Sequence, residues 1–437
     1  MVEKAAKGAR GNRGSYFITP TPGRTSRATL QATCRGLFSE PGCRGGNLFA
    51  PAGAYFNEVS SNYGYSSVGT ISGLDNVVMV PFRDDVAALA SGSIKHWDGS
   101  TFSTVNDADA PATPSTLASV AYRLVAAEAN GDGFGWSKAG LFNDWDASGA
   151  AADIYLPDPI VGQFEIGGDL WSFNSRSTQP WQPTGGSEAE AFATVPGATM
   201  RVGLAARDAI ARVGDGAMFL GHDRRVYRTS GASVVPVENR DLEVALKSLT
   251  AANISADARA FSYRKGAKEF WALTCGLERG FFYDVDLALW HERTKYGADE
   301  YDIHFAATAF EESVVVVGGY DTATLWTLED EVYTDAGTQI VREMSVHVPV
   351  ASDVSVDRIV IDGEWYDQPL SGQGSSPTLL LSVSMDGGAT YSDERSVSLP
   401  AQGTYNVRVQ DWCFGLASAE RGVIVRIRLS DPIGFAV

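Results

Sequence analysis

The chain has 437 residues, of which 44% are hydrophobic, so it can bury a substantial core. Its formal net charge is −18, from 53 acidic and 35 basic residues. A surface this acidic repels phosphates, which argues against nucleic-acid binding over the whole chain. The sequence contains no apolar run long enough to cross a bilayer and no apolar signal-peptide segment, so we expect no membrane-spanning segment and synthesis in the cytosol.

The N-terminal segment departs from the acidic average, and we expect residues 1–30 to form a basic arm. Its first 27 residues carry a single acid, Glu3, against the basic residues Lys4, Lys7, Arg10, Arg13, Arg24 and Arg27. Polar chain ends are often solvated and poorly ordered. The alternative is an arm that folds onto an acidic partner surface or touches DNA.

The middle of the chain reads as a loose repeat in which an apolar run, a Gly or Asp turn and an aromatic residue follow one another. The clusters are Asn47–Val59, Asn76–Val105, one that starts near Arg123, Val161–Gly185, Ala217–Val237, Lys268–Tyr296 and Ser313–Asp335. Such repeats predict an all-β fold, a β-propeller of six or seven blades over residues 31–338. One or two large β-sandwiches are the alternative. We expect short helices only at Asp241–Leu249 and Ala205–Val213.

The pattern changes after Gln339, where apolar and polar residues alternate along longer runs. This period of two is typical of strands with one buried face. We therefore predict a separate C-terminal antiparallel β-sandwich over residues 339–437. Arg426 and Arg428 alternate with apolar residues and should share the side away from the core, as a solvated face or as a subunit contact.

One short motif in that region raises the possibility of carbohydrate chemistry. Ser384, Asp386, Gly388, Thr390 and Tyr391 match the Asp-box of sialidases and related propellers. The same residues explain a well-formed hairpin, because a carboxylate can accept hydrogen bonds from turn amides and glycine permits the turn. Even in sialidases the motif is a fold element away from the catalytic centre, so we interpret it here as a hairpin.

The sequence gives no positive sign of catalysis, and we assign no catalytic, cofactor-binding or metal-binding residue and expect no cofactor. The histidines are scattered singly: His96, His222, His291, His304 and His347. The loops at 130–135 and 144–149 contain oxygen ligands but lack a complete calcium-binding pattern. Cys34 and Cys43 are expected to be reduced, although a disulfide between them is an alternative.

Two stretches carry a more specific pattern. The first contains the turn Ser177–Trp181. The second contains Phe219, Gly221, Asp223, Val226, Tyr227 and Arg228, followed by a short helix. Together they resemble the packaged DNA stabilisation proteins, the tail hub or nozzle family of short-tailed bacteriophages. The C-terminal stretch LLLSVSMDGGATYSDERSVSL and the strands after it also resemble the last domain of the family, so the resemblance extends from about Ala118 to the C-terminus.

The resemblance implies a structural, non-enzymatic virion protein in the phage tail. Six copies would form a homohexameric ring below the portal and the adaptor, or head-to-tail connector, protein. The ring would extend the DNA channel, retain packaged DNA, let it pass during ejection, and attach needle, fibre or spike proteins below. The alternatives are a propeller glycan-binding module, a sialidase-like glycoside hydrolase, and a bacterial propeller scaffold unrelated to phage.

Overall fold

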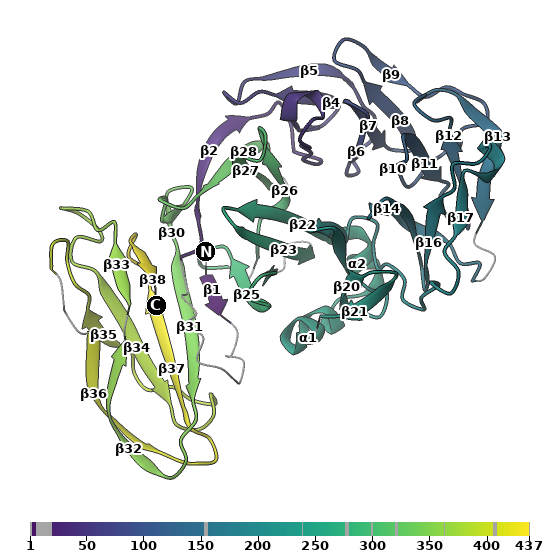
Figure 1. Cartoon of the computed structure of the whole chain (residues 1–437). Helices are drawn as coiled ribbons and strands as arrows, with labels where there is room; N and C mark the ends of the chain where they lie inside the picture. The colour runs from purple at the N-terminus through teal and green to yellow at the C-terminus, as the bar shows by residue number, and fades with distance from the viewer. Residues whose placement is uncertain are drawn as a thin grey trace.

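Residues 2–5, 20–152, 156–237, 239–275, 279–298, 300–319, 322–361, 363–404 and 409–436 are described by a computed structural model of the chain. Strands dominate these residues, with two short α-helices. Figure 1 shows small sheets arranged around a common centre and an elongated group of C-terminal strands beside them. The prediction of an all-β chain is therefore confirmed.

The described residues form seven blades, each a small antiparallel sheet. The first contains β3 (Leu48–Phe49), β4 (Tyr55–Val59) and β5 (Tyr65–Thr70), with Phe38 bridged to Phe49 on its inner side. The second and third contain β6 (Val78–Phe82), β7 (Asp85–Ala90), β8 (Ser93–Trp97) and β9 (Phe102–Thr104), then β10 (Ala118–Val120), β11 (Arg123–Ala127), β12 (Gly133–Ser137) and β13 (Trp145–Ala152). The order matches the expected clusters.

The later blades follow the same pattern. The fourth contains β14 (Ile160–Ile166), β15 (Asp169–Asn174), β16 (Thr178–Pro183) and β17 (Phe192–Thr194). The fifth contains β18 (Ile210–Val213), β19 (Gly216–Leu220), β20 (Val226–Ser230) and β21 (Ser233–Pro236). The sixth contains β22 (Ala258–Lys265), β23 (Lys268–Cys275), β24 (Gly280–Asp284) and β25 (Leu289–Thr294), and the seventh begins with β26 (Ile303–Ala309), β27 (Val314–Gly319) and β28 (Thr324–Glu329).

The circle is closed by a strand from the other end of the chain. Strand β2 (Gly23–Thr29) pairs antiparallel with β28 and becomes the outer strand of the seventh blade. Gly23 is required at this closure, because a Cβ there would lie 2.3 Å from the carbonyl oxygen of Val332. Closing the ring with an N-terminal strand leaves few sheet edges open within the propeller.

Burial of apolar side chains explains why the blades hold together. Seven hydrophobic clusters each join two consecutive blades, including one between the seventh blade and the first. The aromatic residues of three predicted turn motifs, Trp171, Tyr227 and Trp326, are buried in these clusters. Rings also meet across blades, as where Phe173 and Phe219 lie 5.0 Å apart edge to face. Aromatic contacts of this kind add to the stabilisation from buried area.

An eighth cluster belongs to the C-terminal strands. One sheet orders β31 (Val341–Val348), β37 (Val423–Leu429), β34 (Thr378–Ser384) and β35 (Arg395–Ser398). Two pairs accompany it: β32 (Val354–Ile361) with β36 (Val409–Ala417), and β33 (Glu364–Tyr366) with β38 (Gly434–Ala436). Side chains from both groups share this core. The short strands β29 (Thr334–Asp335) and β30 (Thr338–Gln339) lead into it from the propeller.

The N-terminal strand β1 (Val2–Ala5) lies between these two parts of the molecule. It pairs antiparallel with β25 of the sixth blade and parallel with β31 of the C-terminal strands. Figure 1 shows it beside the start of β31. Two groups of strands are thereby joined into one nine-stranded sheet.

One of the two predicted helices is present. Helix α1 (Arg240–Ser248) confirms the first prediction: Asn239 caps it by accepting hydrogen bonds from two backbone amides, and Leu242 and Leu246 are buried one turn apart. Helix α2 (Ala251–Asp257) was not predicted. The prediction of a helix at Ala205–Val213 is wrong, because Ile210–Val213 pairs with β19 and tertiary pairing overrides local propensity.

The basic residues assigned to the N-terminal arm do not lie together: Lys4 belongs to β1, Arg24 and Arg27 belong to β2, and the other three fall elsewhere. Arg24 and Arg27 both form ion pairs inside the chain rather than with a partner. The expected arm therefore includes a strand of the propeller, since ring closure needs residues before position 30. Lys7, Arg10 and Arg13 lie outside the described residues. Cys34 and Cys43 are buried free thiols, so the disulfide alternative is not formed.

Candidate functional site at the centre of the propeller

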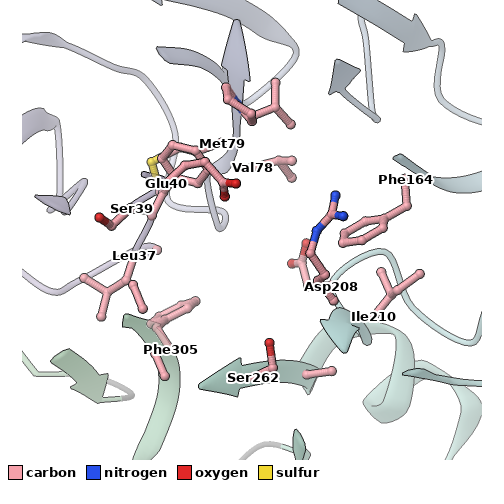
Figure 2. Close-up of a pocket in the computed structure, with 18 of the residues that line it drawn as sticks. Leu37, Ser39, Glu40, Val78, Met79, Phe164, Asp208, Ile210, Ser262 and Phe305 are labelled. Carbon is pink, nitrogen blue, oxygen red and sulfur yellow. The ribbon is translucent and has the colours of Figure 1, made fainter. Parts of the chain in front are cut away.

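The inner segments of all seven blades line a central cavity of about 670 Å³. The segments are residues 36–41 of the first blade and the strands β6, β10, β14, β18, β22 and β26. Figure 2 shows Leu37, Met79, Phe164, Ile210 and Phe305 around its open space. Polar side chains such as Ser39 and Ser262 share the lining with these apolar ones, and its charged groups form two sets.

One end of the cavity is closed by a polar network of Asn76, Arg207, Asp208 and Arg259, called here the closing network. The Asn76 amide donates to the Asp208 carboxylate at 3.0 Å. The Arg207 guanidinium donates to the same carboxylate at 2.9 Å and to the Asn76 carbonyl at 3.1 Å. Asn76 precedes the second blade and Asp208 the fifth, three blades apart in a ring of seven, so this contact crosses the central axis.

Charge pairing keeps the closing network ionised. Burial by itself would raise the pKa of Asp208, but the neighbouring Arg207 and Arg259 and the Asn76 amide lower it below its usual value. The Arg259 guanidinium lies 3.7 Å from the Asp208 carboxylate. The pKa of Arg207 is raised, because attraction to Asp208 outweighs the effect of burial. Such a paired and hydrogen-bonded cluster is a rigid bridge rather than a free charge waiting for a ligand.

The other end of the cavity, called here the mouth, carries Glu40, Glu165, Arg212, Arg264, Glu269 and Glu312. Arg212 pairs with Glu165 at 2.5 Å, and Arg264 lies 3.6 Å from Glu269. The four glutamates outnumber the two arginines, so the mouth is acidic. Burial, together with Glu312 and Glu165, raises the pKa of Glu40 despite the opposing effect of Arg212. A carboxyl group with a raised pKa in a cleft marks a candidate functional position.

The sequence assigned no residue to this cavity. Asp208 lies within Ala205–Val213, the segment for which the sequence predicts a helix. Glu40 precedes an ordinary Pro-Gly turn, which gives no sign of a functional role. One feature of the sequence could have indicated these residues: a polar side chain comes shortly before an apolar inner strand, as Asn76 does before β6 and Asp208 before β18. Without the blade count, nothing in the sequence says that these two positions face one another.

The Asp-box residues lie far along the chain in the C-terminal strands, where they build a turn. The Thr390 amide donates to the Asp386 carboxylate at 2.9 Å, and the Thr390 hydroxyl donates to it at 2.6 Å. The Ser384 hydroxyl accepts from the Gly388 amide at 2.8 Å. These hydrogen bonds lower the pKa of Asp386 well below its usual value. The interpretation as a hairpin is confirmed.

The predicted positions of Arg426 and Arg428 are also confirmed. Val425, Ile427 and Leu429 belong to the C-terminal core, while both arginines approach Glu394 on the other side of the sheet. Arg426 also lies over the ring of Tyr391 at 4.1 Å. Their charges are therefore used within the chain.

Two classes of feature have no counterpart in the part of the chain that the structure describes. No group of three or more His, Cys, Asp or Glu side chains is placed to hold a metal ion among those residues. Within the same residues, no helix has the length and apolar character needed to cross a membrane.

The family comparison decides the class of protein. Residues 4–286 match the family described as Bacteriophage P22 Gp10, β-propeller. The chain belongs to this family. It is thus a member of a family of bacteriophage structural proteins with a propeller fold. The match includes the first blades, where we found no motif, and ends before the C-terminal strands, so the resemblance of LLLSVSMDGGATYSDERSVSL to the family stays a prediction.

The structure accounts for the motif around Tyr227. Gly221, Asp223 and Tyr227 form the hairpin between β19 and β20, in which the Tyr227 hydroxyl donates to the Asp223 carboxylate at 2.7 Å. The Gly221 amide donates to the Arg225 carbonyl at 2.7 Å. Gly221, Asp223 and Tyr227 therefore build the hairpin of a blade.

Comparisons with other proteins add two likenesses in shape. The Neurospora crassa Pan2 WD40 domain shares 8% identity, with 72% of this chain and 95% of that chain covered and a TM-score of 0.43. A chain in the crystal structure of the mitotic checkpoint complex shares 9% identity, with 74% of this chain and 98% of that chain covered and a TM-score of 0.46. None of the curated proteins compared with the chain matches its sequence.

Proposed function

We propose that this protein is a tail hub, or nozzle, of a short-tailed phage. Six copies form a ring below the portal and adaptor, which extends the DNA channel, retains packaged DNA and carries distal tail proteins. The observation that carries the proposal is membership of the phage propeller family over residues 4–286. The closed seven-bladed ring supports it, because a rigid body with few open edges suits a repeated place in a symmetric assembly.

The closing network bears on where DNA would travel. The hydrogen bonds from Asn76 and Arg207 to Asp208 cross the propeller axis, and the cavity beside them measures about 670 Å³. A nucleic-acid duplex cannot pass through so small and bridged a space. In the proposed assembly the DNA channel is therefore the space enclosed by the six copies, and the propellers are its walls.

The charge of the chain suits such a wall. The formal net charge is −18, and like charges keep a surface from holding phosphates. We propose that the face toward the channel is acidic, so that DNA slides past it during ejection. A cryo-electron microscopy map of the ring with a mainly basic channel surface would contradict this part of the proposal.

We further propose that the propeller, residues 31–338 together with β2, and residues 339–437 are separate structural units, the second a β-sandwich. Support comes from the C-terminal core, which is built from strands after Val341 and is distinct from the seven inter-blade clusters. Needle, fibre or spike proteins would attach at the end of the ring away from the portal. Limited proteolysis that leaves two protected fragments would fit this division, whereas fragments cut within the C-terminal core would contradict it.

Cryo-electron microscopy of the purified chain, with and without a candidate portal–adaptor complex, tests the hub proposal. We expect a six-fold ring bound to the adaptor, with propellers around a common channel. A monomer that ignores the adaptor at micromolar concentration would overturn the proposal. The virion location is tested separately by mass spectrometry of purified phage particles.

The alternative is a glycan-binding module or a glycoside hydrolase that uses the central cavity. The mouth does bring carboxylates and arginines together. However, Arg212 and Arg264 are each already beside a glutamate, and Arg207 and Arg259 are beside Asp208. Arginines neutralised in this way are poor receptors for the carboxylate of a substrate, so we propose that the protein is not an enzyme. Binding on a glycan array followed by turnover of the bound glycan would reverse this conclusion.

A further inference from the structure

The central cavity has the dimensions of a small-molecule site. Its volume of about 670 Å³ lies within the roughly 300–1,000 Å³ that is usual for such sites. The closing network blocks one end, and the mouth is open at the other. Arg259 of the closing network and Arg264 of the mouth lie five residues apart on β22, so the two ends are about 16 Å apart at a rise of about 3.2–3.4 Å per residue. The cavity is therefore deep enough to take the body of a small molecule.

Two hydroxyl groups in the cavity wall have no partner inside the protein. Ser119 and Ser262 both line the cavity, and neither hydroxyl takes part in a hydrogen bond with the residues that the structure describes. Figure 2 shows the Ser262 hydroxyl directed into the open space. The apolar part of the wall includes Leu37, Val78, Met79, Phe164, Ile210 and Phe305. A wall that combines apolar side chains with a few free polar groups suits a ligand with a hydrocarbon body.

Two of the four glutamates at the mouth are left without a cationic partner. Each arginine of the mouth already stands beside one glutamate, which leaves Glu40 and Glu312. Within the described part of the chain, no lysine, arginine or histidine lies at ion-pair distance from either carboxylate, and neither carboxylate accepts a hydrogen bond. Figure 2 shows the Glu40 carboxylate at the edge of the open space. These two groups are therefore available to a ligand that enters the mouth.

The two ends of the cavity differ in charge, which selects the sign of a ligand. The closing network has two arginines to one aspartate, whereas the mouth has four glutamates to two arginines. Negative charge at the entrance attracts cations and repels anions. Among the described residues, no group of three or more His, Cys, Asp or Glu side chains is placed to hold a metal ion. The mouth thus fits the single charge of an organic cation better than it fits a metal ion.

We propose that the cavity binds an aliphatic amine, with its ammonium group beside Glu40 at the mouth and its hydrocarbon chain along the inner strands. An ammonium group has three hydrogen-bond donors and no acceptor, so it complements a carboxylate that lacks a donor. The hydrocarbon chain covers apolar wall that water otherwise contacts. The site lies within one copy of the protein and does not depend on the ring. The amine is a free small molecule or the side chain of a lysine presented by a partner protein.

Isothermal titration calorimetry of the full chain with three probes of equal length tests this proposal. Hexylamine, 1-hexanol and hexanoate share the hydrocarbon chain but are a cation, a neutral molecule and an anion at about pH 7. We expect one hexylamine per chain, bound about tenfold or more tightly than 1-hexanol, because hydrogen bonds between charged groups are the strong ones. Hexanoate should not bind. Absence of saturable hexylamine binding up to about 10 mM, or equal affinities for hexylamine and hexanoate, would overturn the proposal.

Matched charge removals locate the ammonium group. Glu40→Gln keeps the size of the side chain and should weaken hexylamine binding about tenfold or more. Glu311→Gln is the control, because Glu311 is exposed next to Glu312 but does not line the cavity, and its affinity for hexylamine should stay within about twofold of the parent. Both substituted residues are exposed, so the melting temperature should stay unchanged in both variants. Equal affinities in the two variants would contradict the placement beside Glu40 and overturn the proposal.

A variant that fills the cavity tests the position of the hydrocarbon chain. Ser262 is half-buried and its hydroxyl faces the open space, so Ser262→Leu places extra volume where the chain of the amine would lie. We expect this variant to bind hexylamine about fivefold or more weakly than the parent, although Glu40 is intact, because overfilled sites resist a further group. An unchanged affinity would mean that hexylamine does not enter the cavity, which would overturn the proposal.

A second amine distinguishes the two sources of the ligand. Nα-acetyl-lysine N-methylamide carries the side chain of a partner's lysine, whereas hexylamine stands for a free amine. Tighter binding of the lysine probe would support a lysine of a partner protein, and tighter binding of hexylamine would support a free small molecule. In both cases the affinity must fall in Glu40→Gln, and an affinity for both amines that is the same in this variant as in the parent would overturn the site.

Discussion

The propeller and the C-terminal strands solve the problem of apolar burial in different ways. Each blade shares a hydrophobic cluster with both neighbours, so seven clusters follow one another around the ring. The C-terminal strands have one cluster. Among the described residues, the C-terminal part has seven exposed large hydrophobic side chains, nearly as many as the eight on the much larger propeller. A closed ring hides its apolar faces by repetition, whereas the C-terminal strands leave proportionally more large apolar side chains exposed.

The largest expected effect breaks the closure of the ring. Arg24 is 5% exposed, pairs with Asp335 and lies 2.9 Å from Asp302. Removing one partner of a buried ion pair leaves an uncompensated charge, so Arg24→Met should lower the free energy of unfolding by about 3–5 kcal/mol. Urea unfolding followed by tryptophan fluorescence measures the change.

Arg27 provides the matched control for that experiment. It lies on the same strand and pairs with Glu329, but both side chains are about one-third exposed. Arg27→Met should cost less than about 1 kcal/mol, as surface ion pairs usually do. Equal losses for the two variants would show that burial of the pair at Arg24 does not strengthen the ring closure.

A substitution in the C-terminal core should act on the other part of the molecule. Leu381 is 1% exposed in the C-terminal cluster, so Leu381→Ala should remove about 2–5 kcal/mol from the stability of that cluster. If the two parts unfold separately, only one of two calorimetric transitions moves. A single transition that shifts as a whole would contradict the proposed division at residue 339.

Comparing the stability of the parent and an Asp208 variant at two pH values tests the ion pairs at the propeller axis. The folded-state pKa of Asp208 is lower than its ordinary value of 3.8, so its ionised form stabilises the native state above that value. This contribution disappears as the pH falls below about 4, toward the folded-state pKa. Asp208→Asn should therefore lose stability at pH 6 but differ less from the parent near pH 2.5. The free energy of unfolding at both pH values tests this sign, and an equal difference at both would contradict it.

The smallest effect is expected at the Asp-box hairpin. Asp386→Ala removes the acceptor of the Thr390 amide and hydroxyl hydrogen bonds. Because this turn is on the surface, we expect faster hydrogen exchange at the Thr390 amide and an unchanged melting temperature of the propeller. Loss of propeller stability in this variant would mean that the hairpin supports more than its own turn.

The sequence predicts the repeating parts of this molecule better than the parts that occur once. The Gly or Asp turns followed by Trp171, Tyr227 and Trp326 revealed the blades, because local hairpin chemistry recurs at each of them. The same local reasoning located α1. Local reasoning failed where the partners are distant in sequence. Arg24 lies in the strand that closes the ring and pairs with Asp335, and Asp208 accepts a hydrogen bond from Asn76, which is 132 positions away. No local pattern encodes such pairs.

The ring closure has a consequence for the time course of synthesis. Strand β2 leaves the ribosome early, yet its partner β28 lies about 300 residues later, since Gly23 pairs with Glu329. At about 5–20 residues per second, β2 waits roughly 15–60 s before it can pair. During that interval the first blade also lacks its neighbour across the closure. The newly made chain therefore depends on the solubility of its unpaired N-terminal strands, and contacts this distant in sequence make the final step of folding a slow one.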